Sequence, residues 1–222
     1  MAFCPQPPLL LPAVAGAPDR ALSLVRAAVS AAVQTLLEDR PEVVVVVGDG
    51  PDGVRYGPGD AGDLRGFGVD RQVAFAGWVR PGGRRIPLPH LVGAWLLDQA
   101  GHAGQRLGVG PADLATALSD VPGPVGVLAM GDGSARRSEK APGHLDPAAG
   151  PFDAAVARAL ADGDAAALAA LDAAEGERLL AAGVPVWRAV GAALAGEQVE
   201  ARLLCDDAPF GVGYLVATWR SR

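Results

Sequence analysis

The longest regular pattern in the chain is an apolar stripe with helical spacing that begins after Asp19. Its apolar residues recur at intervals of three and four positions, which places them on one face of a helix. Asp19 is suited to cap the first turn, because its carboxylate can accept hydrogen bonds from free backbone N–H groups. The pattern ends at Pro41. We therefore predict an amphipathic helix whose buried face consists of Leu22, Val25, Val29, Val33 and Leu36.

Apolar runs without polar alternation indicate buried strands. Residues 42–48 (EVVVVVG) form a run of β-branched side chains, and residues 125–130 (VGVLAM) form a second run. A strand that is apolar on both faces is covered on both faces, as in the sheet of an α/β protein. Residues 72–79 also predict a strand, and residues 8–14 predict a short first strand or extended segment.

Further helices follow from the same spacing rules. Residues 88–101 predict a helix, and residues 152–162 and 164–182 predict an αα-hairpin joined at Gly163. Another helix runs from about Pro185 to Ala195, since proline is well tolerated in a first helical turn. Helices therefore alternate with strands along most of the chain.

Two late strands are predicted at residues 199–207 (VEARLLCDD) and 211–219 (GVGYLVATW). Residues 49–71 are rich in Gly, Pro and Asp and predict a long irregular loop, a kind of segment that is usually functional or disordered. The alternation of strands and helices predicts an α/β fold with a central sheet. No internal repeat or change in composition divides the chain, so we expect a single domain over residues 1–222.

Composition limits the classes of partner. Half of the 222 residues are hydrophobic and the net charge is −6, which argues against disorder and against a nucleic-acid partner, whose binders present a basic face. No apolar run reaches the ~18 residues of a membrane span, and no signal peptide is evident. Cys4 and Cys205 lie far apart in the sequence and indicate two reduced thiols. We expect a cytoplasmic protein that does not enter a membrane.

Two common catalytic motifs are only partly present. GDGPDG at residues 48–53 matches a dinucleotide-binding fingerprint, but the Gly- and Pro-rich segment after it cannot begin the helix that this site requires. Ser134 in GDGSA lacks the surrounding pattern of a nucleophile, and no histidine is tied to it by spacing. We prefer the interpretation that its hydroxyl group bonds to the backbone of the loop. The three histidines show no metal-ligand spacing.

Four segments occur in an order that carries a family resemblance. They are CPQPPLLLP, VVVVGDGP, VLAMGDGSARR followed by GHLDPAAGPFDAAV, and LLCDDAPFGVGYLVA. Together they resemble the landmark segments of the LigB-like class III extradiol ring-cleavage dioxygenase superfamily, which also includes MEMO-type proteins. The third and fourth segments are the most specific. The resemblance spans nearly the whole chain and implies a three-layer α/β/α sandwich with a mixed central sheet and a pocket at one end of that sheet.

The resemblance also implies a site for Fe(II), held by two histidines and a carboxylate, with a further histidine as acid and base. At the matching positions this chain has Gln6 and Gly50 in place of the ligand histidines and Ala135 in place of the acid–base histidine. Asp49 lies beside Gly50. Asp207 stands at the carboxylate position and is the only carboxylate at a ligand position of the family.

The chemistry of these replacements decides what we expect of the site. One carboxylate and one amide bind Fe(II) weakly compared with imidazoles. Ala135 cannot transfer a proton, whereas general acid–base help is typically worth about 10²–10⁴-fold. We expect that ring cleavage by the family mechanism is lost and that no cofactor is bound. Two alternatives stay open: a divergent dioxygenase that uses Fe(II) or another divalent metal, and a subunit that acts as a scaffold in a homo-oligomer.

A pocket without iron would still offer polar groups to a small polar or anionic molecule. Arg136 and Arg137 could pair with a carboxylate or phosphate, or they could be solvated loop charges answered by Glu139. Whether such a protein is an enzyme is left open. The candidate binding residues are Gln6, Asp49, Asp132, Ser134, Arg136 and Asp207.

Three other residues could replace the lost ligands. His144 is close in sequence to Ala135, although a turn histidine that points to solvent is the simpler interpretation. Cys4 and Cys205 each lie two residues from a former ligand position, so on extended backbone both thiols could face the pocket and favour zinc or another soft metal. The alternative, which we prefer, is that both are small buried apolar residues.

Overall fold

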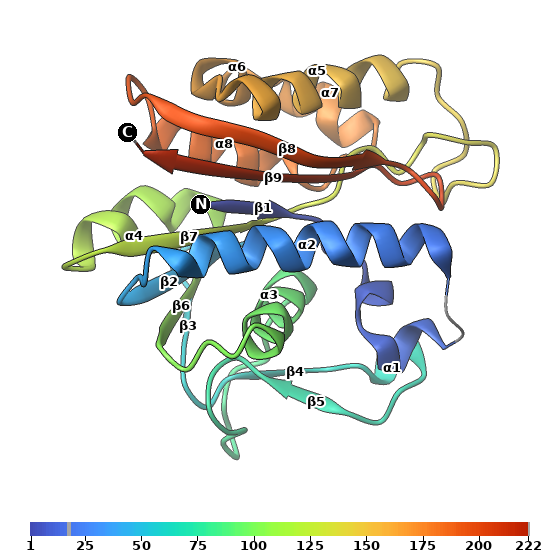
Figure 1. The fold of residues 1–222 in the computed structure, drawn as a ribbon. Helices are drawn as coiled ribbons and strands as arrows, with labels where there is room; N and C mark the ends of the chain where they lie inside the picture. The colour runs from blue at the N-terminus through green and yellow to red at the C-terminus, as the bar shows by residue number, and fades with distance from the viewer. Residues whose placement is uncertain (17–18, 222) are drawn as a thin grey trace.

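A seven-stranded mixed sheet organises the computed structural model, which describes residues 1–16 and 19–221. The strand order is β3-β6-β2-β7-β1-β9-β8 (Figure 1). The four central strands, β6, β2, β7 and β1, are parallel, whereas β3 and β9 run antiparallel to their inner neighbours and β8 antiparallel to β9. The strands are β1 Ala2–Cys4, β2 Val43–Val47, β3 Arg55–Tyr56, β6 Gln105–Val109, β7 Val125–Met130, β8 Val199–Asp207 and β9 Tyr214–Ser221.

Helices cover both faces of this sheet, which confirms the predicted α/β fold with a mixed central sheet (Figure 1). On one face lie α2 (Arg20–Glu38) and α3 (Leu88–Gln99). The other face is covered by α4 Leu114–Asp120, α5 Ala149–Asp162, α6 Ala165–Ala169, α7 Ala173–Arg178 and α8 Val184–Ala193.

The pleat of each strand divides its side chains between two cores. Val44 and Val46 of β2 join the core under α2 and α3, whereas Val45 and Val47 join the core under α4, α5 and α8. All four side chains are inaccessible to solvent. The prediction that this valine run is buried on both faces is confirmed, and the same alternation decides below which face each polar residue takes.

Helix α2 has the predicted stripe and the predicted cap. The Asp19 carboxylate accepts a hydrogen bond from the Leu22 backbone N–H at 2.9 Å, and all five predicted stripe residues are buried. By length and composition α2 is apolar enough to cross a membrane. Its stripe, however, packs on the sheet, as expected of a core helix.

The predicted first strand at residues 8–14 is wrong. Residues Pro8–Leu10 form a 3-10 helix and Pro12–Ala15 form α1, each with a proline in its first turn. Proline favours this position because its missing N–H would be unpaired there and its fixed φ suits a helix. The first strand is β1, which precedes this Pro-rich segment.

The segment from residue 49 to 79 is more ordered than predicted. It contributes β3 to the edge of the main sheet and forms a separate two-stranded sheet from β4 (Ala61–Asp63) and β5 (Gln72–Ala74). The predicted strand 72–79 is therefore shorter, because the chain bends after Ala74.

Strand β6 was not predicted because its first half is polar. Arg106 is nevertheless buried, and its guanidinium donates to the carbonyl oxygens of Phe75 and Ala94 and pairs with Asp98 at 2.7 Å. These partners compensate for the loss of water around the charge. A buried arginine of this kind has no signature in the hydrophobic pattern.

The predicted αα-hairpin is correct at its turn and wrong in its second arm. Gly163 ends α5 in the left-handed region with φ of 69°, a conformation that favours glycine. The second arm divides into α6 and α7. The Asp172 carboxylate accepts hydrogen bonds from the backbone N–H groups of Ala174 and Glu175, so a new helix begins there.

A buried carboxylate of α5 holds the loop that follows β7 at the point where this loop meets the loop that follows β8. Asp153 is fully buried, and its Oδ1 accepts from the Ser134 backbone N–H at 2.8 Å. Its Oδ2 accepts from the Arg137 guanidinium at 2.8 Å. Two backbone hydrogen bonds, Gly133 to Gly213 and Gly213 to Ser134, complete the junction. Gly213 is required there, because a Cβ atom would lie 2.2 Å from Asp153 Oδ2.

We expect Asp153→Ala to reduce the free energy of unfolding by about 3–5 kcal/mol, because Arg137 and the Ser134 N–H lose their buried partner. Urea unfolding at equilibrium measures the loss. Asp162→Ala, on the exposed end of the same helix, should change stability by less than about 0.5 kcal/mol. The double variant Asp153→Ala/Arg137→Ala should lose less than the sum of the single variants. Additive losses would show that the two residues are not coupled.

Candidate functional site

Four polar side chains lie in a row along one edge of the sheet, where the parallel strands end. This carboxyl edge is the usual place for ligand sites in open α/β sheets. In strand order the row consists of Asp132 after β7, Gln6 after β1, Tyr214 at the start of β9 and Asp207 at the end of β8. Figure 1 shows the loop after β7 approaching the β8–β9 turn at this edge of the sheet.

The pleat places the row on the face that α2 and α3 cover. Cys4 and Met130 belong to the core on this face, so Gln6 and Asp132, each two residues later, continue toward it. Tyr214 belongs to the same core, and Asp207 is its partner in the β8–β9 register. We call these four residues the carboxyl-edge row.

Asp132 and Gln6 are in direct contact. The Gln6 backbone N–H donates to Asp132 Oδ1 at 2.7 Å. Burial raises the pKa of the Asp132 carboxyl to about 7, although the hydrogen bond from Gln6 opposes this shift. The pKa of the neighbouring Tyr214 hydroxyl is raised by burial and then by the charge of Asp132. Asp132 can therefore hold or release a proton near neutral pH.

Two buried side-chain atoms have no hydrogen-bond partner within the described residues: Gln6 Oε1 and His90 Nδ1. His90 belongs to α3, on the same face as the row, and is fully buried. Its Nε2 lies 3.0 Å from the Val109 carbonyl oxygen, so the Nε2 proton is donated there and Nδ1 is left as an acceptor. Burial lowers the pKa of His90 to about 4, which keeps the ring neutral.

His90 is held against the loop that follows β2. The ring lies close to Gly48 and Gly50, because a Cβ atom on either glycine would be 3.5 Å from His90 Cε1. Tyr56 and Phe75 enclose the imidazole, with ring centroids 4.9 and 6.4 Å away. The sequence pattern did not single out His90 as a site residue, because a lone histidine on a helix gives no spacing signal.

The remaining predicted carboxylates have different environments. Asp207 is exposed, and its carboxylate accepts from the Ala208 backbone N–H at 2.7 Å. Asp49 lies on the opposite face of the sheet from Gln6, because it alternates with Gly48 after β2. It borders a groove of about 590 Å³ between the β2 loop, α7 and α8, whose other lining residues are Ala173, Gly176, Glu177, Leu180, Ala181, Ala182, Val184, Pro185 and Arg188.

Ser134 and the two arginines hold the loop itself together. Ser134 is fully buried, and its hydroxyl donates to the Leu179 carbonyl oxygen at 2.6 Å, as the backbone-bonding interpretation predicts. Arg136 donates to the carbonyl oxygens of Gly143 and Arg178, and Arg137 pairs with Asp153. Both guanidinium groups therefore have partners within the protein.

The residues at the family's ligand positions do not fit Fe(II). Gln6 offers an amide, Gly50 no side-chain donor, and Asp207 an exposed carboxylate, while Ala135 at the acid–base position cannot transfer a proton. Among residues 1–16 and 19–221, no group of three or more His, Cys, Asp or Glu side chains is arranged to hold a metal ion. His90 contributes a single imidazole nitrogen.

Of the three possible replacement ligands, His144 lies outside the row, whereas Cys4 and Cys205 are on the same face of the sheet as the row. His144 is an exposed turn residue in the left-handed region, with Nδ1 3.0 Å from the Glu139 carbonyl oxygen. Cys4 is buried in the core, and burial raises the pKa of its thiol far above its ordinary value. The pKa of the Cys205 thiol is also raised, by burial and by Asp207 and Asp206. Both thiols therefore resist the deprotonation that soft-metal binding requires.

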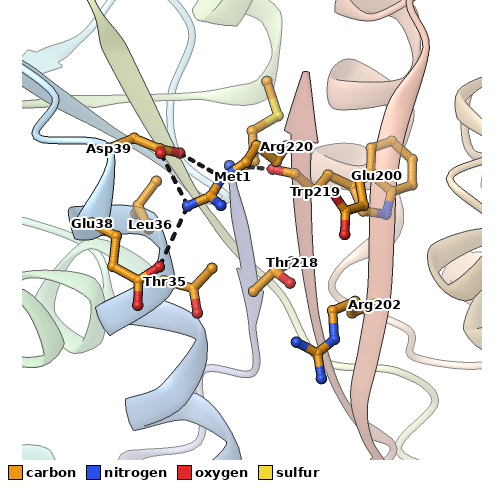
Figure 2. A pocket seen from close by; sticks show the side chains of 10 residues that line it. All are labelled: Met1, Thr35, Leu36, Glu38, Asp39, Glu200, Arg202, Thr218, Trp219 and Arg220. Carbon is orange, nitrogen blue, oxygen red and sulfur yellow. Dashed lines mark hydrogen bonds and ion pairs between the residues drawn. The ribbon is translucent and has the colours of Figure 1, made fainter. Parts of the chain in front are cut away.

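A separate pocket of about 200 Å³ lies at the opposite edge of the sheet, near the start of β1 (Figure 2). Several of its polar groups are bound to neighbouring residues of the protein. Arg220 pairs with Glu38 and Asp39, and the Met1 amino group donates to the Trp219 carbonyl oxygen at 2.6 Å. It contains no residue that the sequence predicted as functional.

Neither a search of protein-family models nor a search of curated proteins finds a match to this chain. The family resemblance is therefore a hypothesis carried by the four sequence segments.

Because the pKa of Asp132 is raised in the folded chain, we predict that the stability of the protein depends on pH. The Asp132 carboxyl has its ordinary pKa of 3.8 in the unfolded chain and a pKa of about 7 in the folded chain. Its ionisation therefore lowers the free energy of unfolding as the pH rises between these two values. Asp132→Asn keeps an acceptor for the Gln6 N–H without a charge. We expect it to raise the free energy of unfolding at pH 8 by about 1–4 kcal/mol and to leave it unchanged near pH 4.

Urea unfolding across pH 4–8 checks this prediction. Asp207→Asn removes an exposed carboxylate from the same row and should change stability by less than about 0.5 kcal/mol at pH 8. A difference between Asp132→Asn and the wild type that is constant with pH would contradict the assignment.

Proposed function

We propose that this chain is an atypical LigB-like protein that binds a small polar molecule at the carboxyl edge of its sheet and lacks ring-cleaving iron chemistry. The observation that carries the proposal is the pair of buried acceptors without partners, Gln6 Oε1 and His90 Nδ1. Leaving such an atom unpaired costs about 1–3 kcal/mol. Two of them near one edge are best explained by a ligand that supplies the missing donors.

The unpaired atoms define the chemistry of the ligand. An amide oxygen and an unprotonated imidazole nitrogen accept hydrogen bonds, so the ligand must present O–H or N–H groups. A neutral hydroxyl- or amide-bearing molecule suits them better than an anion, because Arg136 and Arg137 are bound to other groups. This narrows the expected polar or anionic ligand to a polar hydrogen-bond donor.

Asp132 would adjust this binding to pH. With a pKa of about 7, its carboxyl can donate to a ligand acceptor when protonated and accept from a ligand donor when ionised. Its contact with the Gln6 backbone keeps it at the same edge. A proton-handling group is thus present next to Gln6, although Ala135 provides none.

We also propose a cytoplasmic location. Cys4 and Cys205 are free thiols, and the chain has no disulfide between them, as is usual for proteins of a reducing compartment.

A ligand-observed NMR screen tests the proposed function. The library contains neutral polyols, phenols including catechol, and primary amides, with dicarboxylates as the anionic group. We expect hits among the neutral donors that Gln6→Met weakens at least tenfold, because Met fills the site without an acceptor. The control Gln34→Met lies on the exposed face of α2 and should leave the hits unchanged. Two results would contradict the proposal: hits whose affinity falls equally in both variants, or a screen in which only the dicarboxylates bind.

The iron chemistry is tested separately. In an anaerobic titration with Fe(II), followed by catechol and oxygen, we expect neither stoichiometric iron binding nor ring-opened product. Stoichiometric iron with a yellow ring-cleavage product would contradict the proposed loss of activity.

A further inference from the structure

A second cavity, of about 520 Å³, lies beside the small β4–β5 sheet, away from the carboxyl-edge row. In Figure 1 these two strands lie below the main sheet. The cavity wall is made by three arginines, four glycines and few other side chains. Its lining residues are Gly59, Ala61, Gly62, Asp63, Gln72, Val79, Arg80, Pro81, Gly82, Gly83, Arg84 and Arg85.

Positive charge is concentrated in this cavity although the chain as a whole carries −6. Three arginines, Arg80, Arg84 and Arg85, line the cavity together with one acidic residue, Asp63. The ion pair between Arg85 and Asp63 is long, at 3.6 Å, and the Arg85 side chain is 78% exposed. An exposed pair of this kind is worth little. The Arg84 guanidinium donates to the Arg55 carbonyl oxygen at 2.6 Å, so within the described residues Arg80 and Arg85 are the two lining arginines whose guanidinium groups have no close hydrogen-bond partner.

The backbone around the arginines is fixed in advance. Asp60 is buried, and its carboxylate accepts from the backbone N–H groups of Arg84 at 2.8 Å and Gly57 at 3.0 Å. Gly59 and Gly83 allow the two walls to touch, since a Cβ atom on Gly83 would lie 2.2 Å from the Gly59 carbonyl oxygen. A rigid cavity lowers the entropy cost of ligand binding.

We propose that this cavity binds a phosphomonoester. A phosphate monoester carries a charge of about −2 at neutral pH, which matches the excess of two guanidinium groups. Arginine is also the side chain best suited to phosphate, because its planar fork can donate two parallel hydrogen bonds to two oxygens. A monocarboxylate would leave one positive charge unanswered.

Trp78 does not line the cavity itself but is next to it in the chain. It precedes the lining residues Val79 and Arg80, and its side chain is 67% exposed, which is high for a residue of this size. Tryptophan and arginine together are typical of recognition surfaces. Trp78 also gives a fluorescence signal close to the bound group.

This site is independent of the proposed function, because it shares no residue with the carboxyl-edge row. Titrations with inorganic phosphate, ribose 5-phosphate and acetate, followed by calorimetry and tryptophan fluorescence, test it in the full chain. We expect saturable binding of both phosphates, weaker binding of acetate, and loss of affinity at high salt. Arg80→Gln and Arg85→Gln should each weaken phosphate binding about tenfold or more without changing the melting temperature.

Arg71→Gln is the matched control, since Arg71 is exposed on the same segment but does not line the cavity. It should bind phosphate as the wild type does, and so should Gln6→Met. The proposal is overturned if phosphate shows no saturable binding, if acetate binds as tightly, or if Arg71→Gln weakens binding as much as Arg80→Gln. Selective binding of RNA at these arginines, with no affinity for the small phosphates, would also overturn it.

Discussion

The arrangement of the carboxyl edge depends on the buried carboxylate of Asp153. Taking a carboxylate out of water is costly, and burial raises the pKa of Asp153 even though Ser134 and Arg137 bond to it. Both bonds come from the loop after β7, and Gly213 of the loop after β8 packs directly against the same carboxylate. Asp132 and Tyr214 lie at the roots of these loops, next to the backbone hydrogen bonds between Gly133, Ser134 and Gly213 that join the two loops.

The pleat of the sheet places polar groups that are bonded within the protein on one face and polar groups with unpaired acceptor atoms on the other. On the α4–α8 face and inside the loop, Ser134, Arg136 and Arg137 are all bonded within the protein. On the α2–α3 face, Gln6 and His90 each keep one buried acceptor without a partner. These two acceptors are the basis of the proposal that this edge binds a polar hydrogen-bond donor.

The elements of the fold could be predicted from the sequence where the burial of apolar side chains alone specifies them. The valine run of β2 and the capped stripe of α2 are confirmed because burial alone specifies them. Strand β6 was not predicted because Arg106 is buried with the help of specific partners. The break between α6 and α7 was not predicted because it depends on a single helix cap at Asp172.

The candidate site was predicted in part. Gln6, Asp132 and Asp207 lie in one row, as expected of residues that follow adjacent strands, whereas Asp49 lies on the other face because alternation shifts it by one residue. His90 and Asp153 gave no signal, since their roles arise from contacts between segments far apart in the chain.

The most direct test of the account is the free energy of unfolding of Gln6→Met in urea. We predict a gain of about 1 kcal/mol over the wild type, because an unpaired buried oxygen is removed. A loss of 1 kcal/mol or more would show that Gln6 is a satisfied structural residue and would contradict the account.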